Sequence, residues 1–137
     1  EMCIRDSPKG WDEIMGSHTF HEIQMYYPMR TVRGRKYKLI WNIASPLPYP
    51  FATDLWAAST WQAQFQKGTD ANYGNRSVYS YIHRPKFELY DVINDPAETK
   101  NLAEDSQFAD KLNERKDRLK LLQKQTQDPW ILKWQYE

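Results

Sequence analysis

The sequence contains a single cysteine, Cys3, among 137 residues, so no disulfide can form within the chain. No apolar run approaches the roughly 20 residues that a membrane-spanning helix needs, and no secretory signal pattern is visible. The 19 basic and 18 acidic residues leave a formal net charge of +1, so no strong overall field attracts a polyanion. Neither nucleic acid nor a membrane is therefore an expected partner.

Glycine is scarce, with five residues, whereas aromatic residues make up 15% of the chain, including six Trp and nine Tyr. Rings that carry a polar edge suit interfaces and sugar-binding pockets, where one side packs and the other forms hydrogen bonds. The composition thus favours a chain with substantial half-buried aromatic surface.

Alternating residues predict three β-strands. The stretch from Phe20 to Val32 and residues 37–41 flank Gly34, which is expected to supply the positive φ of a hairpin turn. Residues 87–91 alternate in the same way, with Glu88 and Tyr90 on the face opposite to Phe87 and Leu89, and a turn follows at residues 94–96. The segment from Pro8 to Thr19 shows only a weak pattern, broken by glycine.

A helix is predicted from an N-cap at Ser106 to about Gln125. Its apolar stripe comprises Phe108, Leu112, Leu119 and Leu122, widened by Leu121. An ion pair between Glu114 and Arg118 is expected on its solvated face. The tail that holds Trp130, Ile131 and Trp134 is apolar enough to pack back on the sheet.

Residues 43–82 show little regular pattern. Prolines at positions 46, 48 and 50 exclude a helix there, and a short helix is expected within residues 54–65. The many rings of this segment need a surface to pack against. Because the visible chain offers little such surface, we expect the segment to dock on a neighbour that is absent from the chain.

The candidate binding residues are His18, His21 and Glu22, the only cluster of histidine and carboxylate in the sequence. The spacing does not fit a zinc site, and neither a metal site nor a catalytic nucleophile can be assigned. Two interpretations stay open: polar residues at a strand start, or a pocket for a polar, anionic substrate. Arg30, which is near in sequence, is expected to reach an anionic group.

Basic residues gather around the hairpin turn, at Arg30, Arg33, Arg35, Lys36 and Lys38, with Tyr37 and Trp41 among them. Such a pattern could bind single-stranded nucleic acid. Because the chain is nearly neutral and the basic residues alternate over two strand faces, a solvated hairpin is the preferred interpretation.

Two segments resemble the sulfatase superfamily. Residues 29–40 look like a hairpin near the end of many sulfatases, and residues 87–91, 94–99 and 101–103 are similar to the signature that closes these proteins. Finer features resemble the sulfamidase (N-sulfoglucosamine sulfohydrolase) subfamily: His21-Glu22, residues 25–30, 46–51, Asp54-Leu55 and residues 128–130.

This resemblance implies an α+β fold, in which a small antiparallel sheet with a packed C-terminal helix forms the C-terminal subdomain of an alkaline-phosphatase-like α/β enzyme. The family's formylglycine motif and its calcium ligands have no counterpart here, so calcium is expected only in a full-length parent. The resemblance also implies a pocket-lining role for His18, His21 and Glu22, and a periplasmic, extracellular or lysosomal parent.

The expected domain division has three parts. Residues 1–7 resemble the translation of a sequencing adapter and are interpreted as a scar. Residues 8–25 would be the end of a truncated catalytic domain with an entry strand, and residues 26–137 the C-terminal subdomain. The expected partners are the missing N-terminal catalytic domain, a sulfated sugar and, in the parent, a further copy in a homo-oligomer.

Two hypotheses about function follow. The first is a fragment of a sulfohydrolase that cleaves sulfate from sulfated sugar, inactive without its catalytic core. The alternative is an independent, aromatic-rich module that binds carbohydrate or protein. The two differ in residues 43–65: a module should bury these rings against itself, whereas a fragment should leave them exposed.

Overall fold

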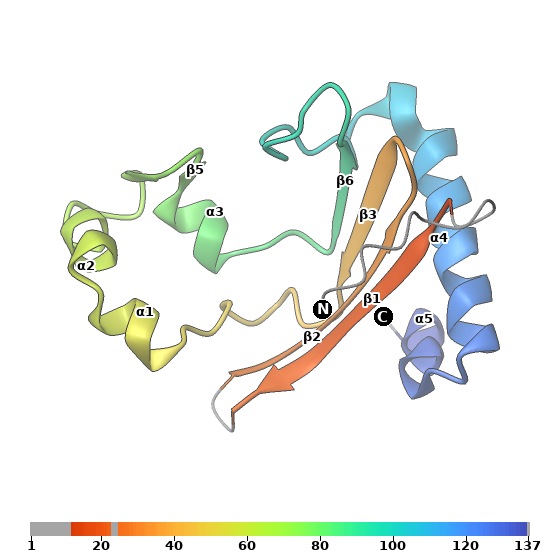
Figure 1. Cartoon of the computed structure of the whole chain (residues 1–137), viewed down its shortest axis with the longest axis horizontal. Coiled ribbons are helices and arrows are strands. Elements are labelled where there is room, and N and C mark those ends of the chain that lie inside the picture. The colour runs from red at the N-terminus through yellow and green to blue at the C-terminus, as the bar shows by residue number, and fades with distance from the viewer. Residues whose placement is uncertain (1–11, 23–24, 137) are drawn as a thin grey trace, which may run out of the picture.

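The computed structural model describes residues 12–22 and 25–136. Its centre is an antiparallel sheet in the order β1-β2-β3-β6, covered on one face by helix α4 (Figure 1). The strands and this helix are β1 (Ile14–His21), β2 (Met25–Arg33), β3 (Tyr37–Asn42), β6 (Phe87–Asp91) and α4 (Ala109–Gln125). The expected α+β fold with a packed C-terminal helix is confirmed. The segment interpreted as a scar lies outside the described residues.

The core lies between the sheet and α4. Strand register places Val32 opposite Leu39, and Leu39 opposite Leu89, so all three side chains share one face. They are fully buried and pack with Leu119 of α4. The expected return of the C-terminal tail is also confirmed, because Trp134 stacks on the buried Trp41 with ring centroids 3.9 Å apart.

Two glycine positions correct the expectations from sequence. Strand β1 begins at Ile14, within the segment of weak pattern, and a Cβ at Gly16 would lie 2.7 Å from Cγ2 of Thr31. Gly16 therefore permits the close approach of β1 to β2. Gly34 does not have the positive φ expected of it. A Cβ there would lie 2.9 Å from the Arg115 guanidinium, which would have to shift.

Residues 43–82 form a helical lobe beside the sheet (Figure 1). Its elements are α1 (Thr53–Ala57), α2 (Ser59–Phe65), β4 (Asn72–Tyr73), β5 (Arg76–Ser77) and α3 (Val78–Ile82). Trp61 is fully buried at its centre, with the rings of Phe51 and Tyr73 about it at centroid distances of 4.8 and 5.0 Å. The expectation that the chain offers these rings little surface is wrong, because many of them pack on one another; docking on a neighbour stays a prediction.

The C-terminal helix differs from the sequence prediction at its edges. The 3-10 turn η1 (Ser106–Phe108) precedes α4, and its N-cap is Asp105 rather than Ser106. Leu121 is 43% exposed and does not widen the apolar stripe. Glu114 pairs with neighbouring basic residues instead of Arg118, whose guanidinium binds Glu13. After α4, the turn η2 (Pro129–Leu132) and α5 (Lys133–Tyr136) form the tail.

Asn101 closes the free edge of β6. Its Oδ1 accepts hydrogen bonds from the backbone N–H groups of Leu89 (2.9 Å) and Ala103 (3.0 Å), and its Nδ2 donates to the carbonyl of Phe87 (3.1 Å). The next residue, Leu102, donates its N–H to the carbonyl of Leu89 and is buried. One side chain thus satisfies backbone groups that an edge strand would otherwise leave unpaired.

Candidate functional site

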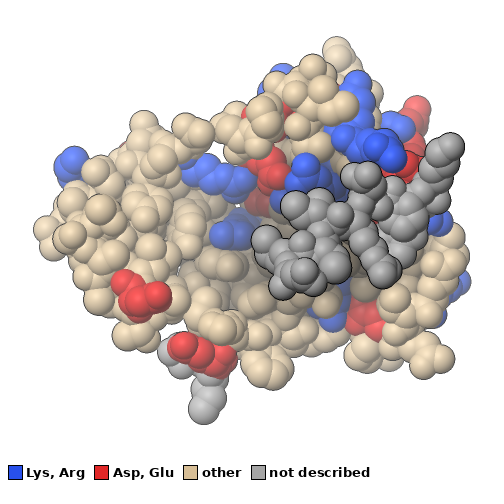
Figure 2. Space-filling view, in the orientation of Figure 1, with Lys and Arg blue, Asp and Glu red and all other residues tan. Residues whose placement is uncertain are grey.

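A pocket of about 340 Å³ lies on the face of the sheet that is turned away from α4. This sheet-face pocket is lined by Gly16, Ser17, His18, Met29, Thr31, Lys38, Ile40 and Arg84. Register explains the set, because His18 pairs with Met29 and Thr31 pairs with Ile40, which puts all four side chains on this face. Figure 2 shows basic and acidic side chains gathered between the lobe and the sheet.

Arg84 follows α3 and precedes Pro85, a position that favours extended backbone. Its guanidinium carbon lies 3.6 Å from the ring centroid of Tyr49 and 5.5 Å from that of Tyr81. Its Nε donates to the carbonyl of Tyr81 at 3.4 Å. Within the described part of the chain, no carboxylate lies at ion-pair distance from Arg84. Stacking on the tyrosine rings therefore positions the Arg84 guanidinium, which forms no ion pair with a described carboxylate.

Lys38 is the second cation of the pocket. Its ammonium binds both carboxylate oxygens of Glu98, at 2.9 and 2.8 Å, and both side chains are about one-fifth exposed. Arg76 reaches the same region, with Nη2 donating to the backbone carbonyl of Glu98 at 2.8 Å and to the Tyr90 hydroxyl at 3.3 Å.

Glu88 lies beside these cations, on the same face as Ile40, and is only 2% exposed. In residues 12–22 and 25–136, no hydrogen bond to its carboxylate is found. Burial raises the pKa of Glu88, while the charges of Arg76, Arg84 and Lys38 oppose that rise. A buried carboxylate facing several cations without contacting one can accept a hydrogen bond from a hydroxyl or an amine.

Two further polar atoms near this face lack partners among the described residues. The hydroxyl of Tyr27 and Oδ1 of Asn42 are both buried without a hydrogen bond. Burial raises the pKa of Tyr27 to about 12, so its hydroxyl stays protonated and able to donate at neutral pH. Buried polar atoms normally have a hydrogen-bond partner, so these two atoms near the pocket are exceptions.

Of the residues predicted from sequence, His18 lies in the pocket, where its Nδ1 is 3.0 Å from the carbonyl oxygen of Tyr27. His21 and Glu22 are exposed at the far end of β1, and neither lines the pocket. At about 3.3 Å per residue, three residues of strand separate His21 from His18 by roughly 10 Å. Closeness in sequence therefore does not bring these three side chains together.

Arg30 has a different role from the one expected. Strand alternation turns its side chain toward α4, away from the sheet-face pocket, and it is 4% exposed. Its Nε and Nη2 bind the two carboxylate oxygens of Asp128 at 2.6 and 3.0 Å. Nη1 donates to the carbonyls of His18 and Met29. The expectation of a ligand contact is replaced by a structural ion pair.

Three residues of this face were not singled out from sequence as a site: Lys38, Arg84 and Glu88. The alternation of residues 87–91 already placed Glu88 on the face opposite to the core. A charged residue between the apolar residues of a short strand was the available signal. Arg84 gave no such signal, because its position depends on Tyr49 in a distant part of the chain.

The last features of the site concern metals and membranes, in residues 12–22 and 25–136. No group of three or more His, Cys, Asp or Glu side chains in this part could hold a metal ion. The residues described thus do not fit the calcium site that the family resemblance implies for a parent enzyme. None of the helices in these ranges combines the length and apolar character needed to cross a bilayer.

Comparison with known proteins relates the chain to one curated enzyme. No family model matches the sequence. The chain is 36% identical over 123 residues to human N-sulphoglucosamine sulphohydrolase, a match that covers 88% of this chain and 24% of the relative. The chain thus spans about a quarter of the length of this curated relative.

Two solved structures share the fold. One is a putative sulfatase from Bacteroides thetaiotaomicron, with a TM-score of 0.57 and 19% identity, over 91% of this chain and 18% of that protein. The other is a 2-O GAG sulfatase with the same TM-score and identity, over 91% of this chain and 19% of that protein. In sequence and in fold, the chain therefore resembles a C-terminal portion of the sulfatase superfamily.

Proposed function

We propose that this chain supplies a substrate-binding wall of a sulfohydrolase that cleaves sulfate from a sulfated sugar resembling N-sulfoglucosamine. The observation that carries the proposal is Arg84, stacked on Tyr49 and without a described acidic partner, beside His18 in a pocket of about 340 Å³. A sulfate or sulfamate group presents several oxygens to which a guanidinium fork can donate paired hydrogen bonds.

The other polar groups of this face suit the sugar itself. Thr31 and Lys38, which line the pocket, can form hydrogen bonds with sugar hydroxyls. The names of the relatives support a sulfated sugar, since one acts on N-sulphoglucosamine and another is a 2-O GAG sulfatase. We favour the N-sulfated sugar because the 36% identity is to the former, whereas the latter, at 19%, supports the fold.

The chemistry of sulfate cleavage is assigned to other parts of a parent protein. The described residues offer no calcium site, and the sequence contains no formylglycine motif. We therefore expect this chain alone to bind the sugar weakly and not to hydrolyse it. Its partner in the parent would be a catalytic domain that provides the nucleophile and the calcium ion.

A binding experiment tests the assignment. Two-dimensional NMR of the 137-residue chain, titrated with N-sulfoglucosamine and separately with glucosamine, should show saturable shifts at His18 only for the sulfated sugar. Arg84→Ala should weaken this binding roughly tenfold, because a charge-assisted hydrogen-bond pair is lost. Lys67→Ala, in the exposed lobe, removes one positive charge elsewhere and should leave the affinity unchanged.

The alternative of an independent binding module has one observation in its favour, the self-packed rings around Trp61. Burial of these rings was expected only of an independent module. Because the chain resembles sulfatases over most of its length, a sulfatase fragment can also bury them, and the packing does not decide between the two hypotheses. Equal binding of sulfated and unsulfated glucosamine, unaffected by Arg84→Ala, would support the module and reject the proposal.

A further inference from the structure

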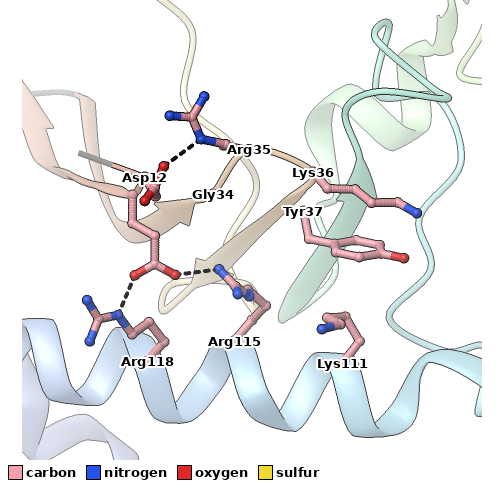
Figure 3. A pocket seen from close by; sticks show the side chains of 9 residues that line it. Asp12, Gly34, Arg35, Lys36, Tyr37, Lys111, Arg115 and Arg118 are labelled. Atoms are coloured by element: carbon pink, nitrogen blue, oxygen red, sulfur yellow. Dashed lines mark hydrogen bonds and ion pairs between the residues drawn. The ribbon is translucent and has the colours of Figure 1, made fainter. Parts of the chain in front are cut away.

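A second pocket, of about 580 Å³, lies between α4 and the turn that joins β2 to β3 (Figure 3). This turn pocket is lined by Asp12, Glu13, Gly34, Arg35, Lys36, Tyr37, Lys111, Arg115 and Arg118. We propose that it is a separate binding site for a sulfated oligosaccharide, outside the site that holds the sugar to be cleaved. Its volume lies within the usual range of about 300–1,000 Å³ for small-molecule sites.

The lining carries more positive than negative charge. Five of the lining residues are basic and two are acidic, and Glu114 adds a third carboxylate at the rim. Figure 3 shows Arg115, Arg118 and Lys111 rising from α4 below the turn that carries Arg35 and Lys36, whose side chains point to either side. Such an arrangement attracts an anion even though the whole chain is nearly neutral. At physiological ionic strength, salt screens charges beyond about 8 Å, so the charges that line the pocket dominate its potential.

Two kinds of ion pair occur in the turn pocket. Glu13 is held by both Arg115, at 2.6 Å, and Arg118, with its side chain 18% exposed, so these three residues form the fixed floor. Arg35 pairs with Asp12 at 2.5 Å, but the two side chains are 75% and 60% exposed. Exposed pairs of this kind contribute only about 0–1 kcal/mol, so a sulfate can displace the carboxylate from Arg35.

The two lysines of the pocket, Lys36 and Lys111, are the residues that we expect to bind the sulfate groups. Lys36 lies 3.7 Å from its acidic neighbour Asp91 and is half exposed, and Lys111 pairs with Glu114 at the surface. The ammonium groups of Lys36 and Lys111 lie 5.2 and 5.4 Å from the ring centroid of Tyr37. Figure 3 shows the Tyr37 ring between the two lysines, so both cations lie beside one ring, and each can donate to a sulfate oxygen.

The turn pocket and the sheet-face pocket lie on opposite faces of the sheet. Tyr37 shares the α4 side with Leu39, whereas Lys38 lines the pocket on the other side. Substitutions in one pocket should therefore not alter the other directly. The choice of a sulfated glycan over another polyanion rests on the proposed function, since a sulfated substrate chain could be held at both places.

Isothermal titration calorimetry of the 137-residue chain with a heparin-derived tetrasaccharide tests the proposal. The double variant Lys36→Ala/Lys111→Ala should weaken binding roughly tenfold, because two charge-assisted contacts are removed. It should also lower the salt dependence of the affinity, because fewer cations contact the ligand. The matched control Lys67→Ala/Lys124→Ala removes the same charge at exposed positions outside the pocket and should bind as the unmodified chain does.

Circular dichroism of each variant confirms that it is folded. Binding of the desulfated tetrasaccharide with equal affinity would overturn the proposal, and so would an equal loss of affinity in the control variant. Tighter binding of single-stranded DNA than of the tetrasaccharide would overturn the choice of ligand. Arg84→Ala separates this site from the proposed function, because it should weaken binding of N-sulfoglucosamine roughly tenfold while leaving tetrasaccharide binding to the lysines.

Discussion

Arg30 and Asp128, separated by 98 positions in sequence, form a two-point ion pair that joins β2 to the turn after α4. The side chains are 5% and 6% exposed. Gln123 donates a further hydrogen bond to the same carboxylate, at 2.9 Å. This contact fixes the end of the helix against the sheet and satisfies charges that burial would otherwise make costly.

Removing one partner of this pair should destabilise the fold strongly. Arg30→Met leaves Asp128 buried and unpaired, and we expect a loss of about 3–5 kcal/mol in the free energy of unfolding, measured by urea denaturation. The double variant Arg30→Met/Asp128→Leu should be less destabilised than Arg30→Met. Equal stability of the single and double variants would contradict this explanation.

The same pair should make stability depend on acid pH. Burial alone would raise the pKa of Asp128, but hydrogen bonds from Arg30, Gln123 and the Trp130 N–H outweigh it and lower the pKa. A lowered folded-state pKa gives stability that is present above the unfolded value of about 3.9 and is lost as pH falls through the folded value. Urea midpoints between pH 6 and pH 2 should therefore decrease less in Asp128→Asn than in the unmodified chain.

Glu88 should act in the opposite sense. Because burial raises its pKa, the folded state binds its proton more tightly than the unfolded state does. The stability that Glu88 contributes is fully present below its unfolded-state pKa of about 4.3. It is lost as the pH rises through its higher folded-state pKa. Glu88→Gln should therefore be more stable than the unmodified chain at pH 7 but not at pH 3, by thermal denaturation. Glu104→Gln, at an exposed position, should show neither change.

Asn101 offers a local test of how the edge of β6 is closed. Asn101→Ala removes three hydrogen bonds to backbone groups, and we expect a loss of about 1–3 kcal/mol. Amide exchange measured by NMR should accelerate most at Leu89, whose N–H loses its acceptor. Asn113→Ala, exposed on α4, is the control; uniform acceleration throughout the sheet in Asn101→Ala would argue against an edge-specific role.

Trp61 should support the lobe without supporting the sheet. Its ring is fully buried among the rings of residues 51, 65, 73 and 81. Trp61→Ala should cost roughly 3–5 kcal/mol locally, as expected for a buried Trp replaced by alanine. Amide exchange should increase in α2 and α3 before it increases in β2 and β3. Simultaneous loss of protection in both parts would show that the lobe and the sheet unfold together.

The sheet and helix were predictable because their periodicity is local. Residues 37–41 and 87–91 alternate over short stretches, and α4 repeats its apolar positions every three or four residues. An entry strand was expected within residues 8–25, but the bounds of β1 were not, because Gly16 and Ser17 lack strand preference and its place depends on the close approach of Thr31. Tertiary pairing overrides local preference at this edge.

The candidate site was only partly predictable for a related reason. Closeness in sequence suggested that Arg30 and His18 act together, but strand alternation turns the Arg30 side chain to the opposite face, where its partner is 98 residues away. Arg84 becomes a pocket residue through stacking on Tyr49, a contact between segments that no local pattern connects. Side chains whose roles depend on long-range contacts cannot be assigned from spacing alone.

The contact between Trp41 and Trp134 has a consequence for the chain as it leaves the ribosome. The β2–β3 hairpin is synthesised before α4, and its apolar face is covered only when α4 and the tail that carries Trp134 have emerged. During that interval the hairpin presents Val32 and Leu39 to the surroundings, a state that invites aggregation or chaperone binding. Translation that stops before the tail should yield a chain retained by chaperones rather than a smaller folded domain.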